Sequence, residues 1–332
     1  GDMILLYNDL FGTYPFKDEK YGHCLAPLGG GMEHQTMTTL TNFSFLLVAH
    51  ELAHQWFGDY ITCSNWQDIW INEGFASYAE YLAYQYLIGP NEAGSWLTRT
   101  HDYIKSAPGG SVFVPDDFAG DEDRIFNYRL SYNKGAAIIH MIRQEVNNDS
   151  LFFSMLKEYL NRYKNSNVTG MDFKNLLEEK TGNDFDNFFE QWYFGEGYPI
   201  HSFTWSYHSD TLYITSLQST SATTPHFNCL IDFRVRYNDK DSMIRMRQLT
   251  NFDHWEVYMP GQVTSISVDP DQWLLMENAG INNLDQIGEI NEFTLVPNPA
   301  RDKITLRFSN PVEPYKVLVA DSSGKILLAE KS

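Results

Sequence analysis

Two histidines and a glutamate lie within five positions of the stretch HELAHQWFGD, residues 50–59. His50 and His54 are four residues apart. Because each residue of a helix turns about 100°, this spacing places both side chains on one helix face, one turn apart. Two imidazoles placed in this way could reach one metal ion, and Glu51 would lie beside that ion rather than under it.

A third candidate ligand, Glu73 in NEGFASY, is separated from His54 by residues 55–72. That distance allows the first helix to end and a second one to return antiparallel. Two imidazole nitrogens, one carboxylate oxygen and an open fourth position are typical of catalytic zinc. Zinc lowers the pKa of its water to about 7, and Glu51 is placed to take the proton and pass it to a leaving amine. We expect Asp59 and Asn72 to contact the ligands from outside.

The composition limits the classes of partner. The 332 residues include 24 Lys plus Arg against 43 Asp plus Glu, a net charge of −19, so nucleic acid and anionic lipid are not expected partners. No apolar stretch approaches 18 residues, which predicts no transmembrane segment. Cys24, Cys63 and Cys229 are too few and too scattered for a disulfide framework or a paired-cysteine metal site. The N-terminal GDMILLYNDLFG does not resemble a signal peptide, and we expect the chain to begin inside a domain.

The elements that must position the motif follow from local patterns. Residues 1–40 contain turns at FGTYPF and PLGGGMEH and are expected to form strands and loops. A helix is predicted over 42–59 and a second over 68–87, where a Gly-Pro pair stops it. Further helices are expected between 91 and 197.

The pattern changes after Gly195. From about residue 201, short alternating runs such as FTWSYH and LIDFRVRY are separated by turn residues and predict an all-β sandwich. A linker then leads to a third segment, again in strands. We therefore predict a multidomain α+β protein, with a mainly helical domain over 1–199, a β-sandwich over 200–280, and a linker with a partial β-rich domain over 281–332.

Four motifs together resemble the gluzincin zinc aminopeptidases, the family that includes aminopeptidase N and leukotriene hydrolase. They are HELAHQWFGD, NEGFASY at the family spacing, GGMEH at 30–34 and SYNKGAAIIHMIR at 131–143. The similarity extends from about residue 8 to 200. It implies a thermolysin-like helical domain and one zinc ion bound by His50, His54 and Glu73, with Glu51 as general base and acid.

The resemblance also implies a substrate-binding segment. The family motif Gly-x-Met-Glu-Asn binds the free α-amine of a peptide through its glutamate. Here it is matched by Gly30, Gly31, Met32, Glu33 and His34, so Glu33 is the expected amine anchor. His34 replaces the family asparagine, which leaves the substrate preference open. The glycines suit a backbone that must approach a peptide closely.

A tyrosine stabilises the oxyanion in the family, and its match is Tyr132 in SYNKG. A phenol in this role contributes roughly 3 kcal/mol, by analogy with other oxyanion donors. Tyr128, one helical turn earlier, is the competing candidate. We predict Tyr132, because it alone lies in the family pattern.

The end of the chain has a second resemblance. FTLVPNPARDKITLRF, with PNPA at 297–300 and Asp302, is similar to the start of the C-terminal sorting domain of type IX secretion in Bacteroidetes-like bacteria. This resemblance implies a protein that is secreted or held on the bacterial cell surface, with the secretion machinery as a partner. The alternative is a generic small β-domain.

The predicted function is a zinc metallo-aminopeptidase acting on peptides with a free N-terminus. Two alternatives stay open. A zinc endopeptidase of the same clan would make Glu33 a bystander. A catalytically incomplete fragment would bind peptide or zinc without turnover, because the family's N-terminal β-rich domain, which contributes to the amine site, has no counterpart here.

Overall fold

The computed structural model describes residues 1–286 and four strand segments, 293–296, 305–308, 316–320 and 326–331. The strands pair antiparallel as β13 (Phe293–Val296) with β14 (Thr305–Phe308), and β15 (Lys316–Ala320) with β16 (Ile326–Lys331). The PNPA motif of the predicted sorting domain lies outside the described residues.

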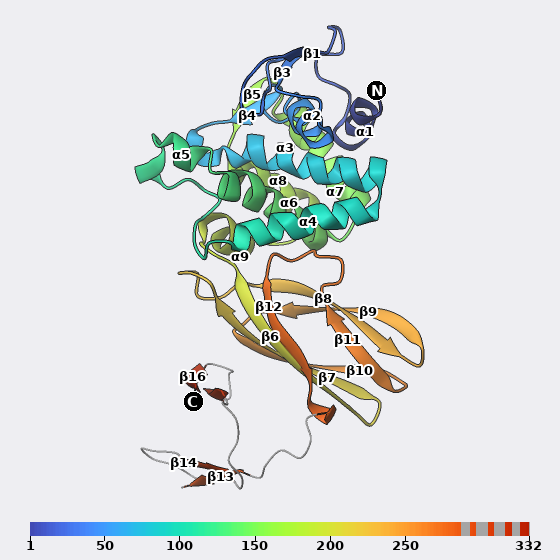
Figure 1. Cartoon of the computed structure of the whole chain (residues 1–332), viewed down its shortest axis with the longest axis vertical. Helices are drawn as coiled ribbons and strands as arrows, with labels where there is room; N and C mark the ends of the chain where they lie inside the picture. Colours follow the sequence, from blue (N-terminus) through green and yellow to red (C-terminus); the bar gives the residue numbers. More distant parts are fainter. Residues whose placement is uncertain (287–292, 297–304, 309–315, 321–325, 332) are drawn as a thin grey trace.

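Helices dominate the first part of the chain, and strands dominate the second (Figure 1). The helices are α1 (Asp2–Phe11), α2 (Phe45–Ala53), α3 (Trp70–Ala83), α4 (Pro90–Lys105), α5 (Glu122–Ile125), α6 (Gly135–Val146), α7 (Asp149–Arg162), α8 (Gly170–Thr181) and α9 (Asp186–Phe188). Shorter or wider helical turns are η1 (Trp66–Asp68), η2 (Tyr84–Ile88), η3 (Asp116–Phe118), η4 (Tyr128–Lys134) and η5 (Phe189–Phe194).

The N-terminal segment corrects one prediction. Residues 2–11 form helix α1, not strand and loop. Tyr7 and Phe11, four positions apart, lie on one face of this helix and pack against Trp56, with ring centroids at 5.9 and 6.2 Å. Burial of this aromatic face by α2 and the turn after it outweighs the weak local pattern.

Helix α2 is also shorter than predicted. It ends at Ala53 instead of continuing to Asp59, because Gly58, at φ 146°, turns the chain into strand β4 (Ile61–Cys63). Strand β4 pairs in parallel with β5 (Ser166–Val168).

Helix α3 is the central element, with every residue buried. It crosses α6 where Gly74 meets Gly135: a Cβ on Gly74 would lie 3.1 Å from the backbone of Gly135, and a Cβ on Gly135 would lie 3.0 Å from Cα of Gly74. Two glycines at the crossing therefore allow the backbones to approach closely, which brings α3 against the segment that carries Tyr132.

A small sheet lies beside α2. Its order is β1-β3-β2, with β1 (Gly22–Leu25) parallel to β3 (Met37–Leu40) and β2 (Gly31–Met32) antiparallel to it. This sheet holds the glycine-rich segment next to the HELAHQWFGD motif.

The strands from Pro199 to Asn283 form two sheets, ordered β10-β7-β6-β12 and β11-β8-β9. Their bounds are β6 (Pro199–His208), β7 (Thr211–Thr220), β8 (Cys229–Tyr237), β9 (Lys240–Gln248), β10 (Phe252–Tyr258), β11 (Val263–Val268) and β12 (Glu277–Asn283). Phe203 and Phe233 pack between the sheets with ring centroids 5.5 Å apart. The change from helix to strand falls between Phe194 and Pro199, and β12 continues three residues beyond the predicted boundary at 280.

The two parts contact each other on the side of the helices opposite α2 (Figure 1). Trp273, in the loop between β11 and β12, stacks on His140 of α6 with ring centroids 4.3 Å apart. Arg247 of β9 pairs with Glu145 at 2.6 Å. The three cysteines are free. Over the part of the chain that the structure describes, no helix has the length and apolarity to span a bilayer.

Candidate active site

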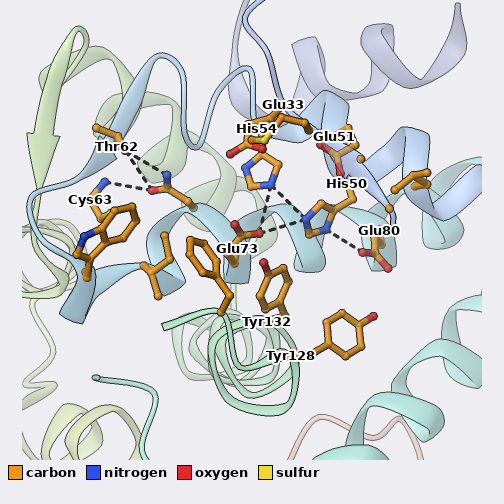
Figure 2. A pocket seen from close by; sticks show the side chains of 18 of the residues that line it. Glu33, His50, Glu51, His54, Thr62, Cys63, Glu73, Glu80, Tyr128 and Tyr132 are labelled. Atoms are coloured by element: carbon orange, nitrogen blue, oxygen red, sulfur yellow. Dashed lines mark hydrogen bonds and ion pairs between the residues drawn. The ribbon is translucent and has the colours of Figure 1, made fainter. Parts of the chain in front are cut away.

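Three donor atoms converge between α2 and the beginning of α3. Nε2 of His50 and Nε2 of His54 lie 3.1 Å apart, and each lies 3.3 Å from Oε2 of Glu73. All three side chains are buried. The four-residue spacing at the end of α2 brings the two imidazoles together edge to face, with ring centroids 4.8 Å apart, and α3 brings Glu73 to the same point (Figure 2). The structure thus brings together the three residues predicted as metal ligands.

The donor set fits one zinc ion. Bonds of ~2.0–2.1 Å at tetrahedral angles separate neighbouring donors by about 3.3 Å. The three separations observed here, 3.1, 3.3 and 3.3 Å, are close to that value. Two imidazoles and a carboxylate are also a ligand set of catalytic zinc sites, which keep a fourth position open.

The other ring nitrogens of the two histidines have partners that fix the orientation of each ring. Nδ1 of His50 donates to Oε1 of Glu80 at 2.9 Å, and Nδ1 of His54 donates to the carbonyl of Phe57 at 2.9 Å. These bonds leave Nε2 of each ring facing the ligand site.

Asp59 and Asn72, predicted to contact the ligands, contact other groups. The side chain of Asn72 bonds to Thr62 and accepts from the N–H of Cys63, which ties α3 to β4. Asp59 accepts from Nε2 of Gln55 at 2.7 Å. Polarity and position near the motif were too weak a signal to assign these partners.

Glu80, in contrast, was missed by the sequence analysis. It follows Glu73 by seven residues, which is two helical turns, so both side chains lie on one face of α3. That periodicity was the available signal. A carboxylate at this spacing from a metal ligand, on the helix that faces the histidines, is a candidate partner for one of them.

Glu51 lies beside the ligands and is buried. Burial raises the pKa of its carboxyl to about 7, against the opposing influence of His50 and His54. Its Oε2 has no hydrogen-bond partner among the described residues. A carboxyl with a pKa near neutrality and a free oxygen facing the site is suited to proton transfer.

Gly31 allows strand β2 to pass directly over Glu51. A Cβ at Gly31 would lie 2.3 Å from Oε1 of Glu51, closer than any real contact. The glycine was predicted to allow close approach of a peptide, but the close approach seen here is to Glu51 itself.

Glu33 points into the same site from the end of β2 (Figure 2). One carboxylate oxygen of Glu33, one of Glu51 and a ring nitrogen of His54 all lie within 4.8 Å of one another. Of the predicted substrate-binding segment, Gly30, Gly31, Met32 and Glu33 line the cleft. The structure does not bring His34 to it: His34 is exposed, and its Nδ1 bonds to Thr39 at 3.0 Å.

Tyr132 faces the ligands, and Tyr128 does not. The ring of Tyr132 stacks against His50 at a centroid distance of 5.9 Å, and Figure 2 shows its hydroxyl directed toward Glu73. Burial and the negative charges of Glu73 and Glu33 raise the pKa of Tyr132 far above its usual range, so its proton is retained. Tyr128 is 56% exposed and lies on the outer side of Tyr132.

One cleft of about 880 Å³ is lined by the three donor residues together with Glu33, Glu51 and Tyr132. Its wall continues from β4 to Trp66 and Phe126, whose rings meet at a centroid distance of 5.8 Å and are 50% and 43% exposed. These aromatic faces offer apolar surface beside the ligand site.

Known proteins resemble this chain over the region just described. Residues 14–192 match the peptidase family M1 domain. Over 273 residues the chain is 28% identical to Aminopeptidase N of Lactococcus lactis subsp. lactis. The matched region covers 80% of this chain and 30% of that protein. Over 165 residues it is 36% identical to Probable aminopeptidase 2 of Sulfurisphaera tokodaii, which covers 46% of this chain and 20% of that protein.

The chain thus spans less than a third of the length of these curated relatives. Among solved structures, a two-domain M1 zinc metallopeptidase variant bound to L-tryptophan superposes with a TM-score of 0.50 and 28% identity. The superposition covers 57% of this chain and 42% of that one.

Proposed function

Because this chain belongs to peptidase family M1, we propose that it is a zinc aminopeptidase that hydrolyses N-terminal residues from peptides. The observation that carries the proposal is the position of Glu33, whose carboxylate approaches Glu51 and His54 within 4.8 Å. A carboxylate beside the ligand site would bind an α-ammonium group and so place the first peptide bond at the metal. The names of both curated relatives agree with this activity.

His50, His54 and Glu73 would hold one zinc ion, which when bound supplies Lewis acidity and lowers the pKa of a water molecule. The protein contributes the orientation of its ligands. Glu80 and the Phe57 carbonyl hold the two imidazoles with Nε2 toward the site.

Glu51 would accept the proton of the attacking water and return it to the leaving amine. Its burial beside the proposed ligands, with an Oε2 that has no partner among the described residues, supports both steps, because a carboxyl held there can take a proton from the water and return it. Tyr132, which retains its proton, would donate a hydrogen bond to the oxyanion that forms at the scissile carbonyl.

Glu33 would select peptides with a free N-terminus. An ammonium group pairs with its carboxylate, whereas an acetylated amine carries no charge and has a larger substituent. The acidic balance of the whole chain agrees with a cationic ligand.

The test uses aminoacyl chromogenic amides, each with a free and an acetylated amine, together with zinc content by elemental analysis. We expect one zinc per chain, turnover on free amines alone, and loss of that turnover in Glu33→Ala. Glu92→Ala, an exposed glutamate on α4, is the matched control and should behave as the unchanged protein.

Equal cleavage of free and acetylated substrates would contradict the aminopeptidase and favour an endopeptidase. Bound zinc without turnover on either substrate would mean that these residues are an incomplete enzyme. The turnover of a longer chain would then be the next measurement, because this chain spans less than a third of its curated relatives.

We also propose that the protein is exported, on the basis of the sequence similarity of its final segment to type IX sorting domains. The measurement is the distribution of the chain between cells and medium in a Bacteroidetes host, with and without residues 281–332. Export that persists without this segment would contradict the proposal.

A further inference from the structure

Gln55 lies directly after the HELAH motif, and its buried amide takes no part in the proposed zinc or proton-transfer chemistry. It follows His54 directly and is fully buried. Its amide faces the segment that carries Glu33 and makes four hydrogen bonds, two of them to that segment.

Two of these bonds hold the segment directly. Nε2 of Gln55 donates to the carbonyl of Glu33 at 3.3 Å, and Oε1 accepts from the backbone N–H of Thr36 at 2.9 Å. The other two fix the amide itself: Oε1 accepts from the hydroxyl of Tyr14 at 3.2 Å, and Nε2 donates to Asp59 at 2.7 Å. Both faces of the amide are therefore used, and its orientation is determined.

The segment that Gln55 holds is strained. Thr36 has φ 61°, a left-handed conformation that is uncommon for a non-glycine residue and an outlier for a β-branched one. Such a conformation persists only where surrounding contacts impose it. Here the N–H of Thr36 donates to Gln55, and the carbonyl of Thr36 accepts from the N–H of Gly22 at 2.9 Å.

The turn is closed by a hydrogen bond from the N–H of Met37 to the carbonyl of His34 at 3.0 Å, and β3 beyond it pairs with β1, so the weakly supported side is the one that carries Glu33. Strand β2, which precedes Glu33, pairs with β3 through two residues only, Gly31 with Leu40 and Met32 with Thr39. Glu33 is the first residue beyond this short ladder. The position of its carboxylate therefore depends on what fixes the turn from residue 33 to 36.

We propose that Gln55 is a positioning residue for the amine anchor: it clamps the strained turn at Thr36 and so fixes Glu33 at the distance from the zinc site that a free α-amine requires. This inference rests on the proposed aminopeptidase function. It adds that the helix motif that supplies two of the proposed metal ligands also sets the distance between the zinc site and the site for the α-amine of the substrate.

The experiment compares two inhibitors with the same zinc-binding group. Phenylalanine hydroxamate carries an α-amine, and 3-phenylpropanohydroxamate lacks it. The ratio of the inhibition constant of the amine-free compound to that of phenylalanine hydroxamate measures the contribution of the amine site alone. The inhibition constant of the amine-free compound reports on the zinc site.

Two variants remove the clamp to different extents. Gln55→Met removes all four bonds at similar volume, and Gln55→Glu keeps the acceptor oxygen for Thr36 but loses the donor to the Glu33 carbonyl. In each variant we expect the ratio to fall about tenfold, which corresponds to ~1.4 kcal/mol, because each variant loses the bond to the Glu33 carbonyl and this figure lies within the net contribution of one hydrogen bond. KM for free-amine substrates should rise by a similar factor while kcat changes less than about twofold.

Replacement of Thr36 by glycine in the Gln55→Met background is the rescue. Glycine adopts a positive φ without strain, so the turn should persist without the clamp and the ratio should recover at least half of its loss. The matched control is Gln218→Met: Gln218 is also a buried glutamine that bonds to the backbone N–H and carbonyl of one residue, Phe227, but it lies in the sandwich. Its ratio should equal that of the unchanged protein.

The outcomes separate the two proposals. If the unchanged protein binds both hydroxamates equally, the amine site itself is absent and the proposed function fails. If the unchanged protein discriminates and either folded Gln55 variant discriminates equally well, the positioning role is wrong. A loss of affinity for both hydroxamates together would also overturn it, because Gln55 would then act on the zinc site.

Discussion

The replacement of Glu80 by glutamine tests how the ligand site is held. The two oxygens of Glu80 accept from different donors: Oε1 from Nδ1 of His50 at 2.9 Å, and Oε2 from Nε1 of Trp96 at 3.0 Å. All three side chains are buried, so water has little access to replace either bond. Glutamine has nearly the same shape but only one acceptor oxygen. In Glu80→Gln, therefore, one of the two N–H groups must face the amide NH₂.

The magnitude follows from the buried donor left without an acceptor. Such a group costs about 1–3 kcal/mol, and loss of the outer partner of a metal-binding histidine typically weakens metal affinity about 10–100-fold. At ~1.4 kcal/mol per factor of ten, this range corresponds to about 1.4–2.8 kcal/mol, so the two arguments agree. We expect the zinc dissociation constant of Glu80→Gln to rise about 10–100-fold.

The assay is competition for zinc against a chelator of known affinity, with thermal unfolding of the zinc-free protein as the control for stability. The double variant E80Q/W96F distinguishes orientation of His50 from a general loss of packing. Without the indole N–H, the amide oxygen of residue 80 is free to accept from His50, and zinc affinity should return to within about threefold of the original.

Two results would refute this reasoning. Unchanged zinc affinity in Glu80→Gln would show that the bond to His50 does not contribute to metal binding. A double variant as weak as the single one would show that the competition with Trp96 is not the cause.

Three further perturbations test other contacts. Gly31→Ala should lower kcat by about 100-fold while zinc content stays at one per chain, because the new Cβ would displace Glu51, the proposed general base, and a general base contributes a factor of that order. Unchanged turnover would contradict the close approach. Burial lowers the pKa of His101 to about 4. Between pH 6.5 and 4 the unfolded chain therefore takes up a proton that the folded chain does not. As the pH drops through this window, the free energy of unfolding should fall by roughly 3 kcal/mol. His101→Gln should lose less stability over the same range in urea titrations, and an identical slope would refute the assignment. Trp273→Ala should lower the free energy of unfolding by about 2 kcal/mol through loss of its stacking on His140, measured by chemical denaturation, whereas KM should not change.

Local periodicity was sufficient to predict that the two histidines lie together. The four-residue spacing of His50 and His54 places them on one face of any helix, whatever surrounds it, and a helix was the expected conformation of this apolar segment. The change from helices to strands near residue 195 was also visible, because alternation of apolar residues changes its period there. Tyr132 could be chosen over Tyr128 by resemblance alone, since both are tyrosines of the same short helical segment, one turn apart.

The same approach failed where a contact joins distant parts of the chain. The N-terminal helix was missed because its stability comes from Trp56 and its neighbours rather than from its own pattern. Asp59 was a candidate partner of the ligands because it is close to them in sequence, yet its carboxylate bonds to Gln55. Residues close in sequence can face different sides of a turn, so proximity did not predict contact.

By itself, the sequence determined which residues could bind the metal, because the rise and turn of a helix depend on local backbone geometry. Only the tertiary structure decided which groups support them. The bond from His50 to Glu80 spans 30 positions, the backbone of Gly31 passes over Glu51, and the strained turn at Thr36 is held by Gln55. These contacts depend on how α2, α3 and the small sheet pack against one another, and no spacing along the chain encodes that packing.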